Sequence, residues 1–111
     1  MKRMIVIAGL LFSSLCYAAN DDGRKIVTAA ATAEALGTGN FRMIDVCAEL
    51  NNTGVISVGF APIAAEATRE GVPLNAGDCW HYEPADRLGD MSKILIDTTV
   101  SGDGVTYTTY D

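Results

Sequence analysis

Short stretches in which apolar and polar side chains alternate limit the fold of this chain more than any other feature of its sequence. In residues 41–50, Ile44, Val46, Ala48 and Leu50 occupy every second position. Successive side chains of a β-strand point to opposite faces, so this period of two indicates a strand with one buried face. Similar stretches, separated by turn residues at intervals of roughly ten positions, follow along the chain. The pattern predicts an all-β fold, a small antiparallel β-sandwich that is jelly-roll-like.

The first predicted pairing is a β-hairpin. The turn sequence Asn-Asn-Thr-Gly follows the first strand at residues 51–54, and residues 55–60 then alternate again. A turn of this kind between two alternating stretches is typical of a hairpin. Ile56, Val58 and Phe60 would share one face of its second strand, and we expect that face to be buried.

Turn residues and prolines divide the rest of the chain. In order, we predict an extended segment at 28–36, a surface loop at 61–71, a turn at 72–78, a short aromatic strand at 79–82, a loop at 86–90, a strand at 93–97 with Ile94 and Ile96 opposite Leu95, a turn at 101–104 and a last strand at 105–110.

The N-terminal segment differs in character from everything after it. Residues 1–19 begin with two basic residues and continue through an apolar run to small residues, the layout of a secretory signal with cleavage after Ala18. The alternative is an apolar arm that stays in the protein and packs against a partner. Residues 20–23, Asn-Asp-Asp-Gly, are a polar breaker. We therefore predict one β-sandwich domain over residues 24–111, a length sufficient for one hydrophobic core.

The state of the cysteines depends on that segment. If Cys16 is removed with a signal, Cys47 and Cys79 remain as an even pair, which an oxidising compartment would join. In a reducing compartment the same two residues would be small buried hydrophobes. Two cysteines 32 positions apart, with a single histidine in the chain, do not form a zinc site.

The charge of the chain argues against direct nucleic-acid binding. Residues 20–111 contain six basic and 14 acidic residues, a net charge of −8, and the basic residues are scattered singly. A nucleic-acid surface needs clustered cations that displace counterions from phosphates.

No motif for catalysis is present. His81 is the only histidine of the chain. Acid–base catalysis by its imidazole would require a carboxylate that the fold places beside it, so we predict that His81 is an ordinary strand residue. The serines lie in no nucleophile pattern, and the sequence has no metal-binding or phosphate-binding motif. Aspartates at 78, 86, 90, 97 and 103 fall at turns or strand ends, where short carboxylates cap backbone amides. We expect no enzyme activity, no cofactor and no metal.

The aromatic residues of the C-terminal half are the candidate contact surface. These are Trp80, Tyr82, Tyr107 and Tyr110, whose side chains offer large contact area at low entropic cost. The alternative is that Trp80 belongs to the core of the sandwich.

Four stretches, in their order and spacing, resemble a known family. They are residues 52–59 (NTGVISVG), 71–78 (GVPLNAGD), 90–97 (DMSKILID) and 102–107 (GDGVTY). The chain is similar over about residues 41–110 to the capsid decoration (staple or cement) proteins of tailed bacteriophages, the type found in short-tailed enterobacterial phages. The resemblance implies a jelly-roll-like β-sandwich on the outer surface of the virion.

By this resemblance the protein is a non-enzymatic structural protein that staples neighbouring major capsid subunits and stabilises the shell. Its partners would be the major capsid protein and other copies of itself, with no direct nucleic acid and no small-molecule substrate. Residues 1–19 conflict with this, because capsids assemble in the cytoplasm. The alternative function is an exported periplasmic or extracellular β-sandwich binding domain with a Cys47–Cys79 disulfide.

Overall fold

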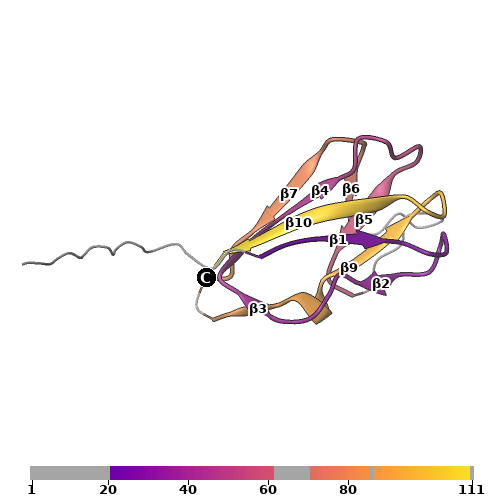
Figure 1. Cartoon of the computed structure of the whole chain (residues 1–111). Coiled ribbons are helices and arrows are strands. Elements are labelled where there is room, and N and C mark those ends of the chain that lie inside the picture. Colours follow the sequence, from indigo (N-terminus) through magenta and orange to yellow (C-terminus); the bar gives the residue numbers. More distant parts are fainter. Residues whose placement is uncertain (1–20, 62–70, 86, 111) are drawn as a thin grey trace, which may run out of the picture.

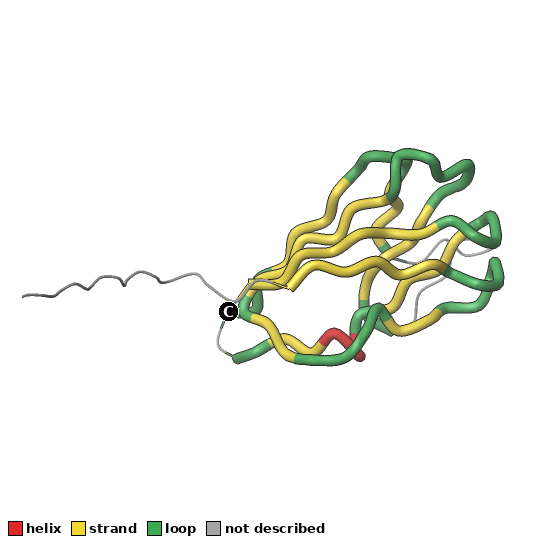
Figure 2. Tube along the Cα trace, viewed as in Figure 1, coloured by secondary structure: helices red, strands yellow, loops and turns green. Residues whose placement is uncertain are grey.

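The computed structural model describes residues 21–61, 71–85 and 87–110, and strands make up nearly all of its regular structure (Figure 2). In chain order the elements are β1 (Asp21–Ile26), β2 (Glu34–Ala35), β3 (Asn40–Phe41), β4 (Met43–Ala48), β5 (Ile56–Gly59), β6 (Val72–Leu74), β7 (Cys79–Tyr82), β8 (Gly89–Asp90), a 3-10 turn η1 (Met91–Lys93), β9 (Leu95–Thr98) and β10 (Gly104–Tyr110). Within these ranges no helix is long and apolar enough to cross a membrane.

Eight of these strands form two antiparallel sheets that lie one over the other (Figure 1). The first sheet has the order β1-β10-β4-β7 and the second the order β2-β9-β5-β6, while β3 and β8 form a separate pair. The predicted all-β, antiparallel sandwich is confirmed. The strand order is compatible with the jelly-roll-like expectation, which stays a prediction.

The core fills the space between the two sheets. Its members are the apolar residues buried on the inner faces and in the connections: Val27, Leu36, Phe41, Ile44, Val46, Ala48, Ile56, Val58, Leu74, Met91, Ile94, Ile96 and Val105. In β4 the burial alternates as the sequence predicts, with Ile44, Val46 and Ala48 buried. Leu50 breaks the pattern and is 85% exposed, because β4 ends at Ala48.

The predicted hairpin between residues 41–50 and 55–60 is wrong. β4 pairs with β10 and β7, whereas β5 pairs with β9 and β6 in the other sheet. Residues 51–54 therefore carry the chain from one sheet to the other. Alternation identifies each strand but not its pairing partner. Two strands that face each other across the core bury their apolar side chains as well as two strands paired in one sheet.

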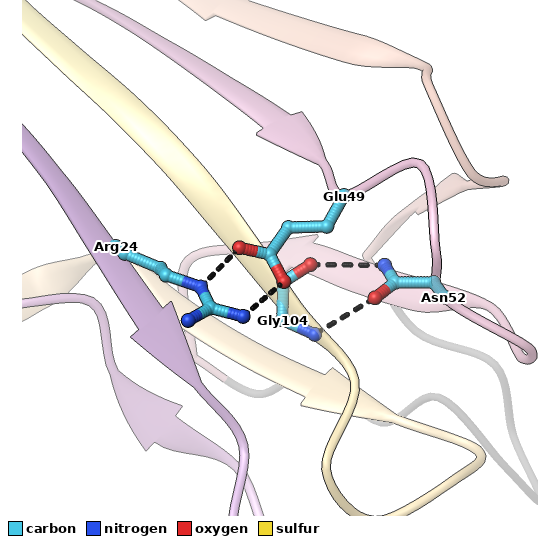
Figure 3. A network of polar contacts seen from close by, with 4 residues as sticks. All are labelled: Arg24, Glu49, Asn52 and Gly104. Atoms are coloured by element: carbon cyan, nitrogen blue, oxygen red, sulfur yellow. Dashed lines mark hydrogen bonds and ion pairs between the residues drawn. The ribbon is translucent and has the colours of Figure 1, made fainter.

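Hydrogen bonds to the backbone fix this crossing (Figure 3). The side-chain amide of Asn52 donates to the carbonyl of Gly104 at 2.9 Å, and its oxygen accepts from the Gly104 amide at 3.0 Å. The Asp103 carboxylate accepts from the amides of Thr53 and Gly54. The turn thus bonds to the start of β10 in the way that a neighbouring strand would.

Replacing Asn52 with alanine should lower the free energy of unfolding by about 1–3 kcal/mol. The buried amide of Gly104 then loses its acceptor, and among the described residues the Gly104 carbonyl keeps only the amide of Glu49 as a donor. Asn51→Ala is the matched control, since Asn51 is exposed. Chemical denaturation of the two variants checks this. Equal, small effects would mean that the Asn52 contacts do not hold the crossing.

Phe60 is also a correction. Ile56 and Val58 are buried as predicted, but β5 ends at Gly59 and Phe60 is 44% exposed. Phe41 takes the core position instead and is 1% exposed. Its ring lies against the backbone at Gly89, where a Cβ atom would come within 2.3 Å of the ring.

Several other boundaries differ from the sequence prediction. The predicted loop 86–90 contains β8, and the predicted strand 93–97 starts as β9 only at Leu95, because Lys93 belongs to η1. β1 begins at Asp21, inside the predicted polar breaker, because the segment pairs with β10 residue by residue. β6 occupies the first part of the predicted turn 72–78, where it pairs with β5. Residues 28–36 contain no helix and include the short strand β2. Most of the predicted loop 61–71, and residues 1–19, lie outside the described residues.

Candidate functional site

The two cysteines of the domain lie opposite each other on β4 and β7. Cys47 and Cys79 are register partners and are joined by a disulfide, with their Cα atoms 4.0 Å apart. The neighbouring pair, Val46 and Trp80, points to the core side of the sheet. Side chains alternate along a strand, so the bridge lies on the outer face. It ties the edge strand β7 to the middle of its sheet.

The four predicted contact aromatics do not form one surface. Trp80, Tyr82 and Tyr107 are half-buried and pack against the core between the sheets. Tyr110 is three residues beyond Tyr107, an odd spacing, and points to the opposite face of β10. The alternative weighed for Trp80, a role in the core, is the one that the structure supports.

Phe60 is the aromatic residue that sequence reasoning assigned to the wrong environment. Its ring centroid lies 5.0 Å from that of Tyr82 and 6.1 Å from that of Trp80, both in edge-on contact. Trp80 and Tyr82 stack on each other with centroids 5.5 Å apart. The three rings form a cluster where β5 of one sheet meets β7 of the other.

A cluster of three polar side chains, Asp45, His81 and Tyr110, lies on the outer face of the first sheet. Asp45 on β4 faces its register partner His81 on β7, and the Nδ1 atom of His81 is 2.7 Å from the Asp45 carboxylate. The hydroxyl of Tyr110 donates to the other carboxylate oxygen at 3.2 Å. The hydrogen bond to Asp45 raises the pKa of His81 above its ordinary value of 6.5. Burial, followed by the Asp45 contact, raises the pKa of Tyr110.

The titration of His81 is a direct test of this pair, because the chain has one histidine. We expect an imidazole pKa above 6.5 in the folded protein and a return toward 6.5 in Asp45→Asn, measured by NMR. Because the folded pKa is the higher one, the stabilisation is complete below about pH 6.5 and is lost as the pH rises through the folded pKa. An unchanged His81 titration in Asp45→Asn would contradict the pairing.

This aspartate–histidine pair has no nucleophile beside it among the described serines and cysteines. Ser57 is buried in the other sheet, Ser92 donates its hydroxyl to Asp90, and Ser101 accepts from the amide of Ala30. Both described cysteines are in the disulfide. Within the described part of the chain, no three His, Cys, Asp or Glu side chains converge as metal ligands.

The aspartates at turns act as backbone caps. Asp78 accepts from the amide of Asn75, Asp90 accepts from the amide and hydroxyl of Ser92, and Asp103 holds the crossing described above. Asp97 accepts from the amide of Thr98, and Asp86 lies outside the described residues. The sequence-based interpretation of these carboxylates as turn caps is confirmed for 78, 90 and 103.

Three of the hollows on the described surface lie near these groups. One of about 620 Å³ lies beside the disulfide and is bordered by Cys47, Leu50, Arg24 and Glu49. The last two form the ion pair drawn in Figure 3. The other two, about 490 and 370 Å³, adjoin each other through Arg87 and Leu88. The aromatic cluster borders the smallest.

Comparison with known proteins gives no assignment: no family model, no curated protein and no solved structure matches this chain.

Proposed function

We propose that this protein is an exported, non-enzymatic binding domain whose sandwich is stapled by the Cys47–Cys79 bridge. The bridge is the observation that carries the proposal. Disulfides persist in secreted and periplasmic proteins and are rare in reducing compartments. The signal-like pattern of residues 1–19 is an independent argument for the same destination.

A binding role follows from what surrounds the candidate sites. The polar pair of Asp45 and His81 lies on an open sheet face without a described serine or thiol beside it. Aromatic and charged side chains border two hollows at the C-terminal end of β7. Such surfaces recognise a partner through contact area and charge.

Capsid decoration is the second candidate, and the placement of the resembling motifs favours it. Three of the four motifs contain β5, β6 and β9, which are neighbours in one sheet. These three motifs contribute the core residues Ile56, Val58, Leu74, Met91, Ile94 and Ile96, whereas Val72 is 42% exposed. The similarity thus follows a continuous part of the scaffold. Since core positions do not contact a partner, the motifs support a related fold more strongly than a shared partner.

Intact mass spectrometry of the natural protein, with and without thiol alkylation, separates the two. For the exported domain we expect chains that begin at Ala19, weigh two hydrogens less than the reduced form and take up no alkylating reagent before reduction. For the decoration protein we expect purified virions to contain chains that begin at Met1 or Lys2, with free thiols. Unprocessed, reduced protein confined to virions would overturn our first proposal.

A further inference from the structure

The two smaller hollows together form a surface that the predicted contact set missed, which we call the cationic groove. Arg42, Arg87 and Leu88 border its first part, and Phe60, Leu88 and Lys93 border the second. Arg87 and Leu88 border both hollows, of about 490 and 370 Å³, so the two adjoin each other.

The groove is lined by the described basic residues that have no ion-pair partner among the described carboxylates. Five basic residues are described. Arg24 pairs with Glu49, and Lys25 pairs with Glu34 at 3.0 Å. The remaining three, Arg42, Arg87 and Lys93, make no ion pair with any described residue and all line the groove. In a domain with a net charge of −8 this concentration favours an anionic occupant.

The carboxylates that border the groove are directed to other partners. Asp90 accepts from the backbone amide of Ser92 at 2.9 Å and from its hydroxyl at 2.7 Å. Glu83 lies 3.8 Å from the Nε2 atom of His81. Lys93 is close enough to contribute to the lowered pKa of Asp90, after the Ser92 hydrogen bonds. The guanidinium groups of Arg42 and Arg87 keep their donors for a ligand.

Apolar side chains between these cations indicate what kind of anion fits. Phe60 is 44% and Leu88 49% exposed, an aromatic and an aliphatic side chain beside the same hollow. A sugar ring needs an open aromatic face, but Trp80 covers one face of Tyr82 and Phe60 meets both rings edge-on. Phe60 and Leu88 are better suited to an apolar peptide side chain.

We propose that the cationic groove binds an acidic peptide segment, with an apolar side chain against Phe60 and Leu88 and carboxylates on Arg42, Arg87 and Lys93. The inference rests on the proposed binding role and not on the route of export. It holds equally for a domain outside the cell and for one on a virion.

The test is fluorescence anisotropy of a fluorescein-labelled 12-residue peptide of alternating Glu and Leu, titrated with the full, bridged chain. We expect saturable binding that weakens with added salt. Arg87→Gln/Lys93→Gln should weaken binding by roughly tenfold or more, as expected for the loss of two direct charge contacts. Leu88→Ser should weaken it in a salt-independent way. Arg24→Gln/Lys25→Gln is the matched control, because it removes the same charge from paired residues and should leave the affinity unchanged.

Two results would overturn the proposal. One is an equal loss of affinity in both double variants, which would show that the peptide responds to the net charge of the domain and not to the groove. The other is saturable binding of polygalacturonate at this groove with no binding of the peptide, which would make the ligand an acidic glycan. Thermal melts of each variant show that it is folded. The mass measurement described above tests export separately. A processed, disulfide-bonded protein that does not bind the peptide would contradict the peptide proposal and leave the export proposal intact.

Discussion

Phe41→Ala is expected to lower the free energy of unfolding by about 3–5 kcal/mol, the range for removing a fully buried aromatic side chain. Phe41 is 1% exposed, lies on Gly89 and meets Tyr82 edge-on at 6.2 Å. Its removal leaves a cavity where the β3–β8 pair joins the sandwich. Small domains have about 5–15 kcal/mol of stability in total, so the variant should melt far below wild type.

Phe60→Ala is the matched control for this experiment. The same atoms are deleted, but nearly half of the Phe60 side chain already faces solvent, and only its contacts with Trp80 and Tyr82 are lost. We expect a cost of about 0.5–1.5 kcal/mol, the value of an aromatic pair contact. Denaturant titration of both variants measures the difference. A larger effect at Phe60 than at Phe41 would show that their burial has been assigned the wrong way round.

Removing the disulfide is the second large effect. Cys47→Ala/Cys79→Ala should lower the free energy of unfolding by about 3–4 kcal/mol, because the bridge closes a loop of 32 residues in the unfolded chain. The folded sheet should persist, since Ala48 still bonds to the backbone of Gly77 and Asp78 at that end of β7. Circular dichroism at low temperature and a thermal melt check the two statements.

Chemical reduction supplies the control for the cysteine variants. Wild-type protein treated with dithiothreitol should melt at the temperature of the double variant, and reduction should not change the double variant itself. If oxidised and reduced wild type melt together, the bridge contributes nothing to stability.

The sequence revealed the strands better than their partners. Period-two alternation placed β4 and the burial of Ile44, Val46 and Ala48 correctly, because each depends on local geometry. The hairpin failed because the same alternation is compatible with pairing in one sheet or with facing across the core. The choice between these two arrangements depends on hydrogen bonds from Asn52 and Asp103 to backbone groups about 50 positions away in the sequence.

The candidate site was predicted only in part, because the sequence analysis did not consider which face of a strand each aromatic residue occupies. The odd spacing of Tyr107 and Tyr110 already places them on opposite faces of any strand, so this error was avoidable from the sequence. The cationic groove was not visible in the same way. Arg42 is far in sequence from Arg87 and Lys93, and the pairing of β3 with β8 brings it to the same side of the domain as these two residues.

The register between β1 and β10 also determines how the domain would respond to a pulling force. Asp21 faces Thr109, so the start of β1 and the end of β10 lie side by side at one end of the sheet. β1 is an edge strand, and β10 is the only strand of the sheet with which it pairs in the described part of the chain. A load applied between segments attached to these two points would open the β1–β10 ladder one residue pair at a time, which takes less force than shearing all pairs together. β1 would therefore detach first, while the covalent bridge at the opposite edge keeps β7 in place.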